Sequence, residues 1–186
     1  AFTLDRLGQS AAKFDLKKLQ WLNGQHIRRL TPEDLRDRVL PILQKAGLDT
    51  SSKSPEWLTK MAAICQEKIP TLNDIVAYTD FFFRDVEAYE EKAVNKHFKA
   101  NGAVERVAAL REMMASVATW DHDTLKAAYE AKAAESGSSL GQFVHPTRLA
   151  LTGKSVGPGL FELAELLGKD TCLARMDKAI AYIKSL

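Results

Sequence analysis

The chain has 186 residues, of which 46% are hydrophobic, and its formal net charge is +2. This length allows a sizeable buried core, arranged as one domain or as two small connected domains. No apolar run approaches the ~18 to 20 residues that span a bilayer, and the first residues lack the apolar segment of a signal peptide. We therefore expect a cytoplasmic protein without membrane association.

The cysteines, histidines and charges further narrow the class of protein to which the chain can belong. Cys65 and Cys172 lie far apart within apolar helical patterns, which favours buried free thiols over a disulfide. None of the 4 histidines has a cysteine at ligand spacing, so the sequence indicates no metal site. Residues 1–60 hold 11 Lys/Arg and 7 Asp/Glu, residues 61–135 hold 9 and 13, and residues 136–186 hold 6 and 4. Basic ends around an acidic middle suit an elongated polyanion, and a chance pattern explains totals of this size equally well.

Two helices are predicted at the start of the chain. Thr3 can cap a short helix over residues 4–7, and Asp15 can cap a longer one from residue 16 to about residue 29. The longer helix has an apolar stripe formed by Leu16, Leu19, Leu22 and Ile27. Trp21 lies among basic side chains on the other faces, which suits contact with a sugar-phosphate backbone; the alternative is an ordinary core aromatic.

Residues 31–88 carry the signals of a second helical group. Thr31-Pro32 and Ser54-Pro55 each place a capping hydroxyl before a proline at the first helical position. Thr71-Leu-Asn-Asp74 resembles a capping box, and the helix after it leads into Phe81-Phe82-Phe83. Three consecutive aromatics cannot share one helix face, so we interpret them as a plug between two helical layers.

Residues 89–186 form a third group, separated from the second by an acidic stretch. Helices are predicted near residues 90–98, 103–117, 121–135, 160–167 and 170–183. Asp121 is expected to cap its helix and not to act in acid/base chemistry. Since no segment alternates as a strand does, the predicted fold is all-α, with two small helical subdomains in tandem over residues 31–88 and 89–186.

The stretch from Gln142 to Phe161 contains the most distinctive turn. Thr152-Gly153 stops an apolar run, and Gly157-Pro158-Gly159 forms a corner before a new helix starts. The free N–H groups of a helix start suit phosphates or base edges, and Arg148 lies on the incoming side. From the residues alone, a plain connector between two core helices explains the turn as well.

Two signatures resemble one known family. Gln142, Pro146, Arg148, Ala150-Leu-Thr-Gly153 and Pro158-Gly-Leu-Phe161 resemble the anticodon-binding end of bacterial-type glutamyl-tRNA synthetases, which are class I aminoacyl-tRNA synthetases. Phe14-Asp15, Lys18-Leu19, Trp21-Leu-Asn-Gly24 and Ile27-Arg28 resemble the segment that follows the catalytic domain of this family. The resemblance covers essentially the whole chain. It implies the helical anticodon-binding cage of that family, with residues 1–30 as the end of a region that contacts the tRNA stem.

The resemblance also implies roles for individual residues. It assigns the inner tRNA surface to Lys18, Trp21 and Arg28, and the anticodon to Lys68, His145, Arg148, Gly157, Pro158 and Leu160. Arg148 would donate hydrogen bonds to a base, Pro158 and Leu160 would supply an apolar face, and Gly157 would permit close backbone approach. The sequence departs from the family in having His145 where Gln is frequent and Lys68 where Arg is frequent. The alternative for Lys68 is that its charge merely neutralises the C-terminal end of its helix.

The expected protein is then the C-terminal part of an ATP-dependent glutamate–tRNA ligase. The His-x-Gly-His and Lys-x-Ser-Lys motifs of the catalytic domain do not occur in these residues, so we expect no activity of this chain alone and no cofactor in it, with ATP and Mg in the catalytic domain. Expected partners are that domain and tRNA(Glu), with tRNA(Gln) as a further candidate, and we expect a monomer. The rival interpretation is a helical protein-interaction or scaffold module without a nucleic-acid role.

Overall fold

The computed structural model describes residues 15–186, which are helical and contain no strand. The helix predicted from Thr3 lies outside the described residues. The α-helices are α1 Leu16–Ile27, α2 Pro32–Lys45, α3 Pro55–Cys65, α4 Ile75–Thr79, α5 Glu91–Ala93, α6 Ala103–Ser116, α7 His122–Ser136, α8 Gly141–Thr152, α9 Leu160–Leu167 and α10 Lys169–Lys184. Short 3-10 turns cover Leu72–Asp74 and Asp80–Phe82, and a π-helical turn covers Val94–Phe98. Within the described range, no helix is long and apolar enough to cross a membrane.

The helix starts confirm the predicted caps. The side chains of Asp15, Thr31, Ser54 and Asp121 each accept the backbone N–H three residues later, at 3.0, 3.1, 3.2 and 2.8 Å. Each bond satisfies one of the N–H groups that a helix start leaves without an internal partner. Asp121 therefore acts as a cap, as its position in the sequence predicted.

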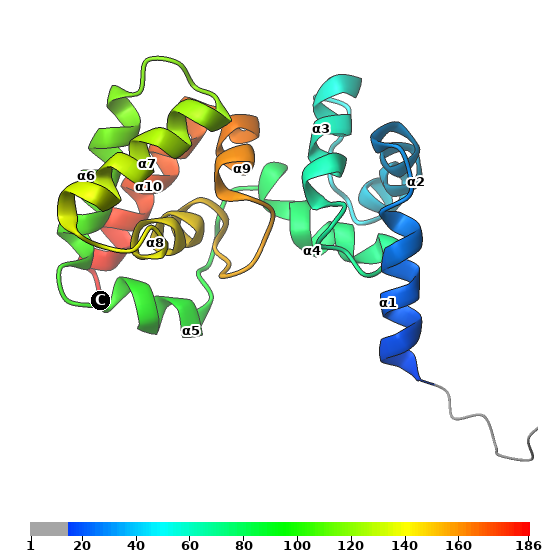
Figure 1. The fold of residues 1–186 in the computed structure, drawn as a ribbon, viewed down its shortest axis with the longest axis horizontal. Helices are drawn as coiled ribbons and strands as arrows, with labels where there is room; N and C mark the ends of the chain where they lie inside the picture. Colours follow the sequence, from blue (N-terminus) through cyan, green and yellow to red (C-terminus); the bar gives the residue numbers. More distant parts are fainter. Residues whose placement is uncertain (1–14) are drawn as a thin grey trace, which may run out of the picture.

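The helices form two groups joined by α9 (Figure 1). The first group contains α1 to α4, and the second contains α5 to α8 with α10. Trp57 from α3 donates its indole N–H to the Leu166 carbonyl at 3.1 Å, and Trp120 from the second group donates to the Ala164 carbonyl at 2.9 Å. Both carbonyls lie in the second half of α9, so each group is bonded to the same end of this helix.

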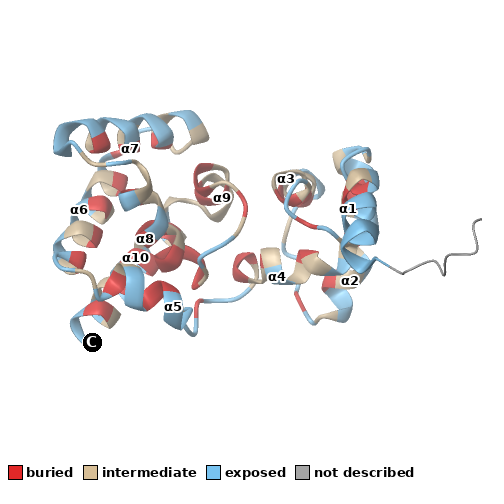
Figure 2. Cartoon of the chain, turned by 60° about the horizontal axis from the view of Figure 1, so that its bottom comes forward, coloured by how far each residue is buried: buried red, intermediate tan, exposed pale blue. Residues whose placement is uncertain are grey.

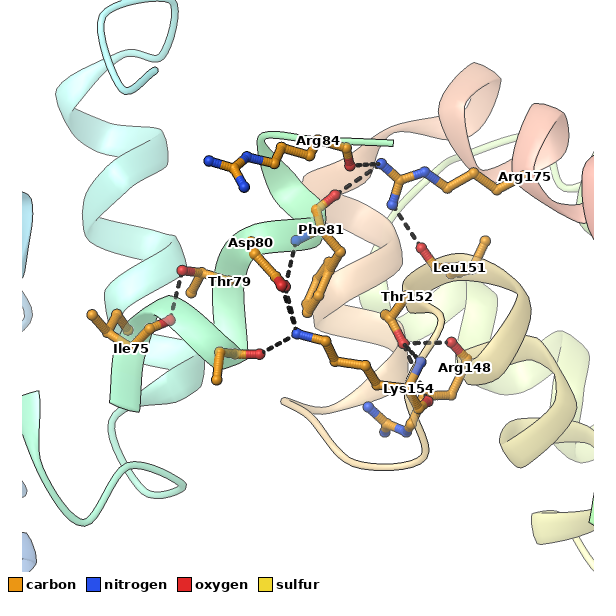
Figure 3. A network of polar contacts seen from close by, with 11 residues as sticks. Ile75, Thr79, Asp80, Phe81, Arg84, Arg148, Leu151, Thr152, Lys154 and Arg175 are labelled. Carbon is orange, nitrogen blue, oxygen red and sulfur yellow. Dashed lines mark hydrogen bonds and ion pairs between the residues drawn. The ribbon is translucent and has the colours of Figure 1, made fainter. Parts of the chain in front are cut away.

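A buried arginine makes a second joint between the groups. Arg175 of α10 is 7% exposed and donates to the Leu151 carbonyl at 2.6 Å and to the Phe81 and Arg84 carbonyls at 2.8 and 3.0 Å (Figure 3). Phe81 and Phe82 are buried beside it, and Phe82 meets Trp57 edge to face at 5.4 Å between ring centroids. The aromatic run therefore lies between the groups, as predicted.

The core-facing side of α10 contains both fully and half-buried residues. The buried ones are Cys172, Arg175, Met176, Ala179 and Ile183. Leu173 and Ile180 are half-buried against the same core. Cys65 and Cys172 are buried free thiols, as expected, and burial raises the pKa of each to about 12.

The predicted apolar stripe of α1 is not a buried stripe in this structure. Leu16, Leu19 and Leu22 are 57%, 48% and 46% exposed, and Figure 2 shows α1 largely as exposed surface. Only Gly24 and Ile27, near the C-terminal end of the helix, are buried. The helix meets the rest of the chain at that end, where Gln66 donates to the Ile27 carbonyl at 2.9 Å. The expectation was wrong because the leucines lie before the C-terminal part of α1, which is the part that contacts the other helices of the first group.

Candidate nucleic-acid interface

The loop of residues 153–159 between α8 and α9 contains two of the predicted anticodon residues, Gly157 and Pro158, and it is held in place by its neighbours. Gly153 ends α8 with φ +75°, a conformation that favours glycine. A Cβ atom on Gly153 would also lie 2.5 Å from the Ala88 carbonyl oxygen, so glycine is required there on two grounds. The Thr152 hydroxyl donates to the Arg148 carbonyl at 2.8 Å and accepts the Lys154 N–H at 3.1 Å, which closes the end of the helix.

Charge-assisted hydrogen bonds join this loop to the chain segment of residues 77–90. The Lys154 ammonium donates to both Asp80 carboxylate oxygens, at 2.6 and 2.7 Å, and to the Ala77 carbonyl at 2.6 Å (Figure 3). The Glu90 carboxylate accepts the Ser155 N–H at 2.9 Å and its hydroxyl at 2.6 Å, and these bonds lower the pKa of Glu90. Such charge-assisted bonds are stronger than neutral ones. The loop is thus fixed to both helix groups.

Lys154, Asp80 and Glu90 were not among the predicted site residues. Lys154 and Asp80 lie 74 positions apart in the chain, and the bond from Ser155 to Glu90 spans 65 positions. No periodicity or cap signal links residues at such separations. Their pairing follows from the tertiary fold, which brings residues 77–90 to the loop, and could not be predicted from local patterns.

Arg148 of α8 holds the loop through its backbone. Its guanidinium donates to the Pro158 carbonyl at 2.5 Å, and burial lowers its pKa while the nearby Glu162 carboxylate opposes that change. A Cβ atom on Gly157 would lie 3.2 Å from an Arg148 nitrogen, so the absence of a side chain at Gly157 leaves room for the guanidinium. Arg148, Gly157 and Pro158 therefore lie together. The structure shows that Gly157 makes room for Arg148, and its role in the close approach of a ligand stays a prediction.

Pro158 and Leu160 do not present the exposed apolar face that was expected of them. Both are buried, and Leu160 is 4% exposed. The apolar side chain that does reach the surface of this loop is Val156, which is 64% exposed and which the sequence-based prediction omitted. Pro158 and Leu160 instead fix the corner and the first turn of α9, and so determine where Val156 stands.

Three other predicted residues, His145, Lys18 and Trp21, occupy two other places. His145 is exposed on α8, and its ring stacks on that of His97 with centroids 5.4 Å apart and planes at 21°. Lys18 and Trp21 are exposed along α1, Trp21 by 62%. Neither of these places includes Arg148 itself, so the predicted residues do not form one compact cluster.

Arg28 is bonded to the residue before Lys68, although Arg28 and Lys68 belong to different predicted surfaces. The Arg28 guanidinium donates to the carbonyl of Glu67, the neighbour of Lys68, at 3.4 Å. Asn23 of α1 donates to the Pro70 carbonyl at 2.6 Å, which holds residues 67–70 against the end of α1. Lys68 is exposed, and its N–H donates to the Cys65 carbonyl at 2.9 Å in the turn after α3. The structure thus connects the proposed stem surface with one proposed anticodon residue.

These features define a helical binding module. Its exposed cations, its exposed tryptophan and a loop fixed at both ends are arranged on open surface, a composition suited to contact with a large, negatively charged ligand. Between residues 15 and 186, no group of three or more His, Cys, Asp or Glu side chains is placed to hold a metal ion.

Comparison with known proteins identifies the family. Residues 34–180 match the model of the anticodon binding domain family, and the chain belongs to that family. It is 38% identical over 186 residues to the glutamate–tRNA ligase of Moorella thermoacetica, and 36% identical over 183 residues to glutamate–tRNA ligase 1 of Caldanaerobacter subterraneus subsp. tengcongensis. Each alignment covers 98% of this chain and 38% of the relative. The chain therefore spans well under half the length of these relatives.

Solved structures show the same fold. The crystal structure of a glutamate tRNA ligase from Elizabethkingia meningosepticum matches with a TM-score of 0.81 at 25% identity, covering 98% of this chain and 35% of that one. The glutamate-tRNA synthetase of Elizabethkingia anophelis matches with a TM-score of 0.78 at 26% identity. The predicted all-α fold and the family resemblance are confirmed.

Proposed function

We propose that this chain recognises tRNA(Glu) through the anticodon loop and the inner stem surface, as the C-terminal part of a glutamate–tRNA ligase. The observation that carries the proposal is the match of residues 34–180 to the anticodon binding domain family. It is supported by the names of the relatives and by the loop of residues 153–159, which is fixed by Arg148, Lys154 and Ser155 before any ligand arrives. A preformed loop loses little conformational entropy on binding.

The proposal divides the anticodon residues into two kinds. Arg148 uses one nitrogen to hold the Pro158 carbonyl, and a guanidinium has further N–H donors for an anticodon base. Gly157, Pro158 and Leu160 shape the loop, while the exposed residues Lys68 and His145 meet the RNA directly. Lys68, as a point charge, fixes geometry less sharply than an arginine would. It therefore supports less discrimination between the last anticodon bases of tRNA(Glu) and tRNA(Gln).

The exposed face of α1 contacts the stem in this proposal. Lys18 contributes charge, and Trp21 offers a flat apolar surface to a sugar or base. Arg28 fastens the end of α1 to the segment that carries Lys68, so that stem and anticodon contacts share one rigid support.

The proposed ligase activity belongs to the longer polypeptide. Because this chain spans 38% of the length of its relatives, the remaining length would contain the catalytic part, with ATP and Mg acting there. The proposed enzyme is a cytoplasmic monomer that joins glutamate to tRNA(Glu), with tRNA(Gln) as a second candidate substrate.

One observation favours a different function. Leu16, Leu19 and Leu22 give α1 an exposed apolar face, which suits contact with a protein. A helical protein-interaction module without a nucleic-acid role therefore remains the second candidate.

Measuring binding of labelled tRNA(Glu) to the chain by fluorescence anisotropy separates the two functions. We expect the logarithm of the binding constant to fall linearly with the logarithm of the salt concentration, because lysines and arginines displace counterions from phosphates. Arg148→Ala should weaken binding by about 1 to 3 kcal/mol, whereas Lys132→Ala on α7, where Glu135 is its ion partner, should leave binding unchanged. Absence of salt-dependent tRNA binding would favour the protein-interaction module.

A further inference from the structure

A basic groove lies beside the loop of residues 153–159. One hollow of about 280 Å³ is lined by Ser155 and Lys92 together with three residues, Lys96, His97 and His145. These three also line a second hollow of about 340 Å³, which extends to Arg106. The two hollows thus adjoin at the histidine pair, and together they run from the loop to the start of α6.

The histidine pair is held by an unusual backbone. Lys96 and His97 lie on the π-helical turn Val94–Phe98. Such turns are rare in proteins, and those that occur are often found at functional sites. His145 comes from α8, and its ring lies nearly parallel to that of His97 with centroids 5.4 Å apart. The rings are thus brought together from two elements that are distant in the sequence.

The groove has an excess of positive charge. Within residues 15–186, no carboxylate forms an ion pair with Lys92, Lys96 or Arg106. Glu90 is the carboxylate at its edge, and it is bonded to Ser155. Burial, followed by the charges of His145, Lys96 and Arg106, lowers the pKa of His97. In the free protein, protonation of this ring is therefore opposed by its surroundings.

We propose that this groove binds a backbone phosphate of the RNA strand whose bases meet the loop of residues 153–159, and that His97, stacked on His145, takes up a proton when it binds. This inference rests on the proposed function and adds a site to it. A phosphate carries the negative charge that the groove lacks, and it accepts hydrogen bonds from ammonium, guanidinium and imidazolium groups alike. The anion would reverse the electrostatic cost of protonating His97, so binding and protonation are linked.

The linkage has a defined sign. The surroundings lower the pKa of His97 in the free protein, and a phosphate in the groove would raise it again, so binding takes up a proton at this ring. Binding should therefore strengthen as the pH falls. The stability of the free protein should respond in the opposite direction, because a lowered pKa of His97 favours the neutral ring in the folded state and that contribution is lost as the pH falls below about 6.5.

The test measures binding of the chain to a short RNA hairpin that carries the tRNA(Glu) anticodon loop, at pH 6 and pH 8 and constant ionic strength. We expect binding to be tighter at pH 6 by a few-fold, because one linked proton whose pKa rises by about one unit on binding gives at most about a tenfold change, and less when the free pKa lies below about 6.5. His97→Gln with His145→Gln should remove this difference, and His122→Gln, in which the lost ring pairs with Asp123 on α7, should preserve it. His97→Arg should keep tight binding at both pH values. Circular dichroism of each variant verifies the fold.

A second arm identifies the ligand group. Replacing single phosphates of the hairpin by neutral methylphosphonates should remove the pH dependence at one linkage and leave it intact at the others. RNA binding that is independent of pH in the unaltered protein, or that keeps its pH dependence in the double His variant, overturns the inference while leaving the proposed function standing. Absence of RNA binding at every pH would instead refute the proposed function.

Discussion

Arg175 gives the sharpest test of how the two helix groups are joined. Its guanidinium is 7% exposed and donates to the carbonyls of Leu151, Phe81 and Arg84 at 2.6, 2.8 and 3.0 Å. Arg175→Met keeps an unbranched side chain that reaches the level of the arginine Nε, but it removes every donor. The three carbonyls would then lose their partner in a dry region, where each unsatisfied polar group costs about 1 to 3 kcal/mol.

The expected net effect is smaller than the sum of these costs. Removing the buried charge also relieves its desolvation, which is reflected in the lowered pKa of Arg175, and some carbonyls will find water. We therefore expect Arg175→Met to lower the free energy of unfolding by about 3 to 5 kcal/mol, the range seen when one partner of a buried polar network is removed.

Urea denaturation followed by circular dichroism measures this change. The matched control is Arg111→Met, which removes an exposed bidentate pair with Asp177 on the same helix α10 and should change stability far less. If Arg175→Met differs from the unaltered chain by less than about 1 kcal/mol, the three hydrogen bonds do not join the groups and the explanation is wrong.

Three further predictions concern the loop, the thiols and α1. Lys154→Met should free the loop from Asp80, which hydrogen exchange of the loop amides would reveal as faster exchange with little loss of helix protection; unchanged exchange would show that the clamp is dispensable. Cys65 and Cys172, with pKa values raised to about 12, should resist Ellman's reagent at pH 8 in the folded chain and react fully in guanidinium chloride; rapid reaction of the native protein would contradict their burial. Trp21→Ala should weaken binding of tRNAs with different anticodons about equally, because a stem contact carries no anticodon information, and a selective loss for one anticodon would argue against that role.

The sequence predicted the local features of the fold well. Thr31 and Ser54 precede prolines, and a hydroxyl followed by proline encodes a helix start within four residues. The predicted capping box is also present, since the Asp74 carboxylate accepts the Thr71 N–H at 2.8 Å. Signals of this kind depend on neighbours in the chain, so they can be recognised without tertiary structure.

The predictions that were wrong concern features that depend on tertiary packing. The leucines of α1 have the spacing of a core stripe, but spacing does not show whether a partner covers them. Arg175 occupies a core position that a hydrophobic pattern assigns to an aliphatic residue. Its carbonyl partners lie 24 to 94 positions away in the sequence, so a local pattern could not reveal that an arginine would be satisfied there. Pro158 and Leu160 were placed in the site by resemblance, which does not reveal that their side chains are buried.

The division into residues 31–88 and 89–186 stays a prediction. The family model runs across the proposed boundary, from residue 34 to residue 180. Lys154, Arg175 and Trp57 all make bonds that cross it. These bonds favour unfolding of the two groups as one cooperative unit.

The dissociation constant of the chain for tRNA(Glu), compared with that for the same tRNA carrying one altered anticodon base, tests the central claim most directly. If the fixed loop with Arg148 recognises the anticodon, the altered base should weaken binding by about 1 to 3 kcal/mol, and Arg148→Ala should abolish that difference for the base it contacts. Equal affinity for the two tRNAs would contradict anticodon recognition by this chain.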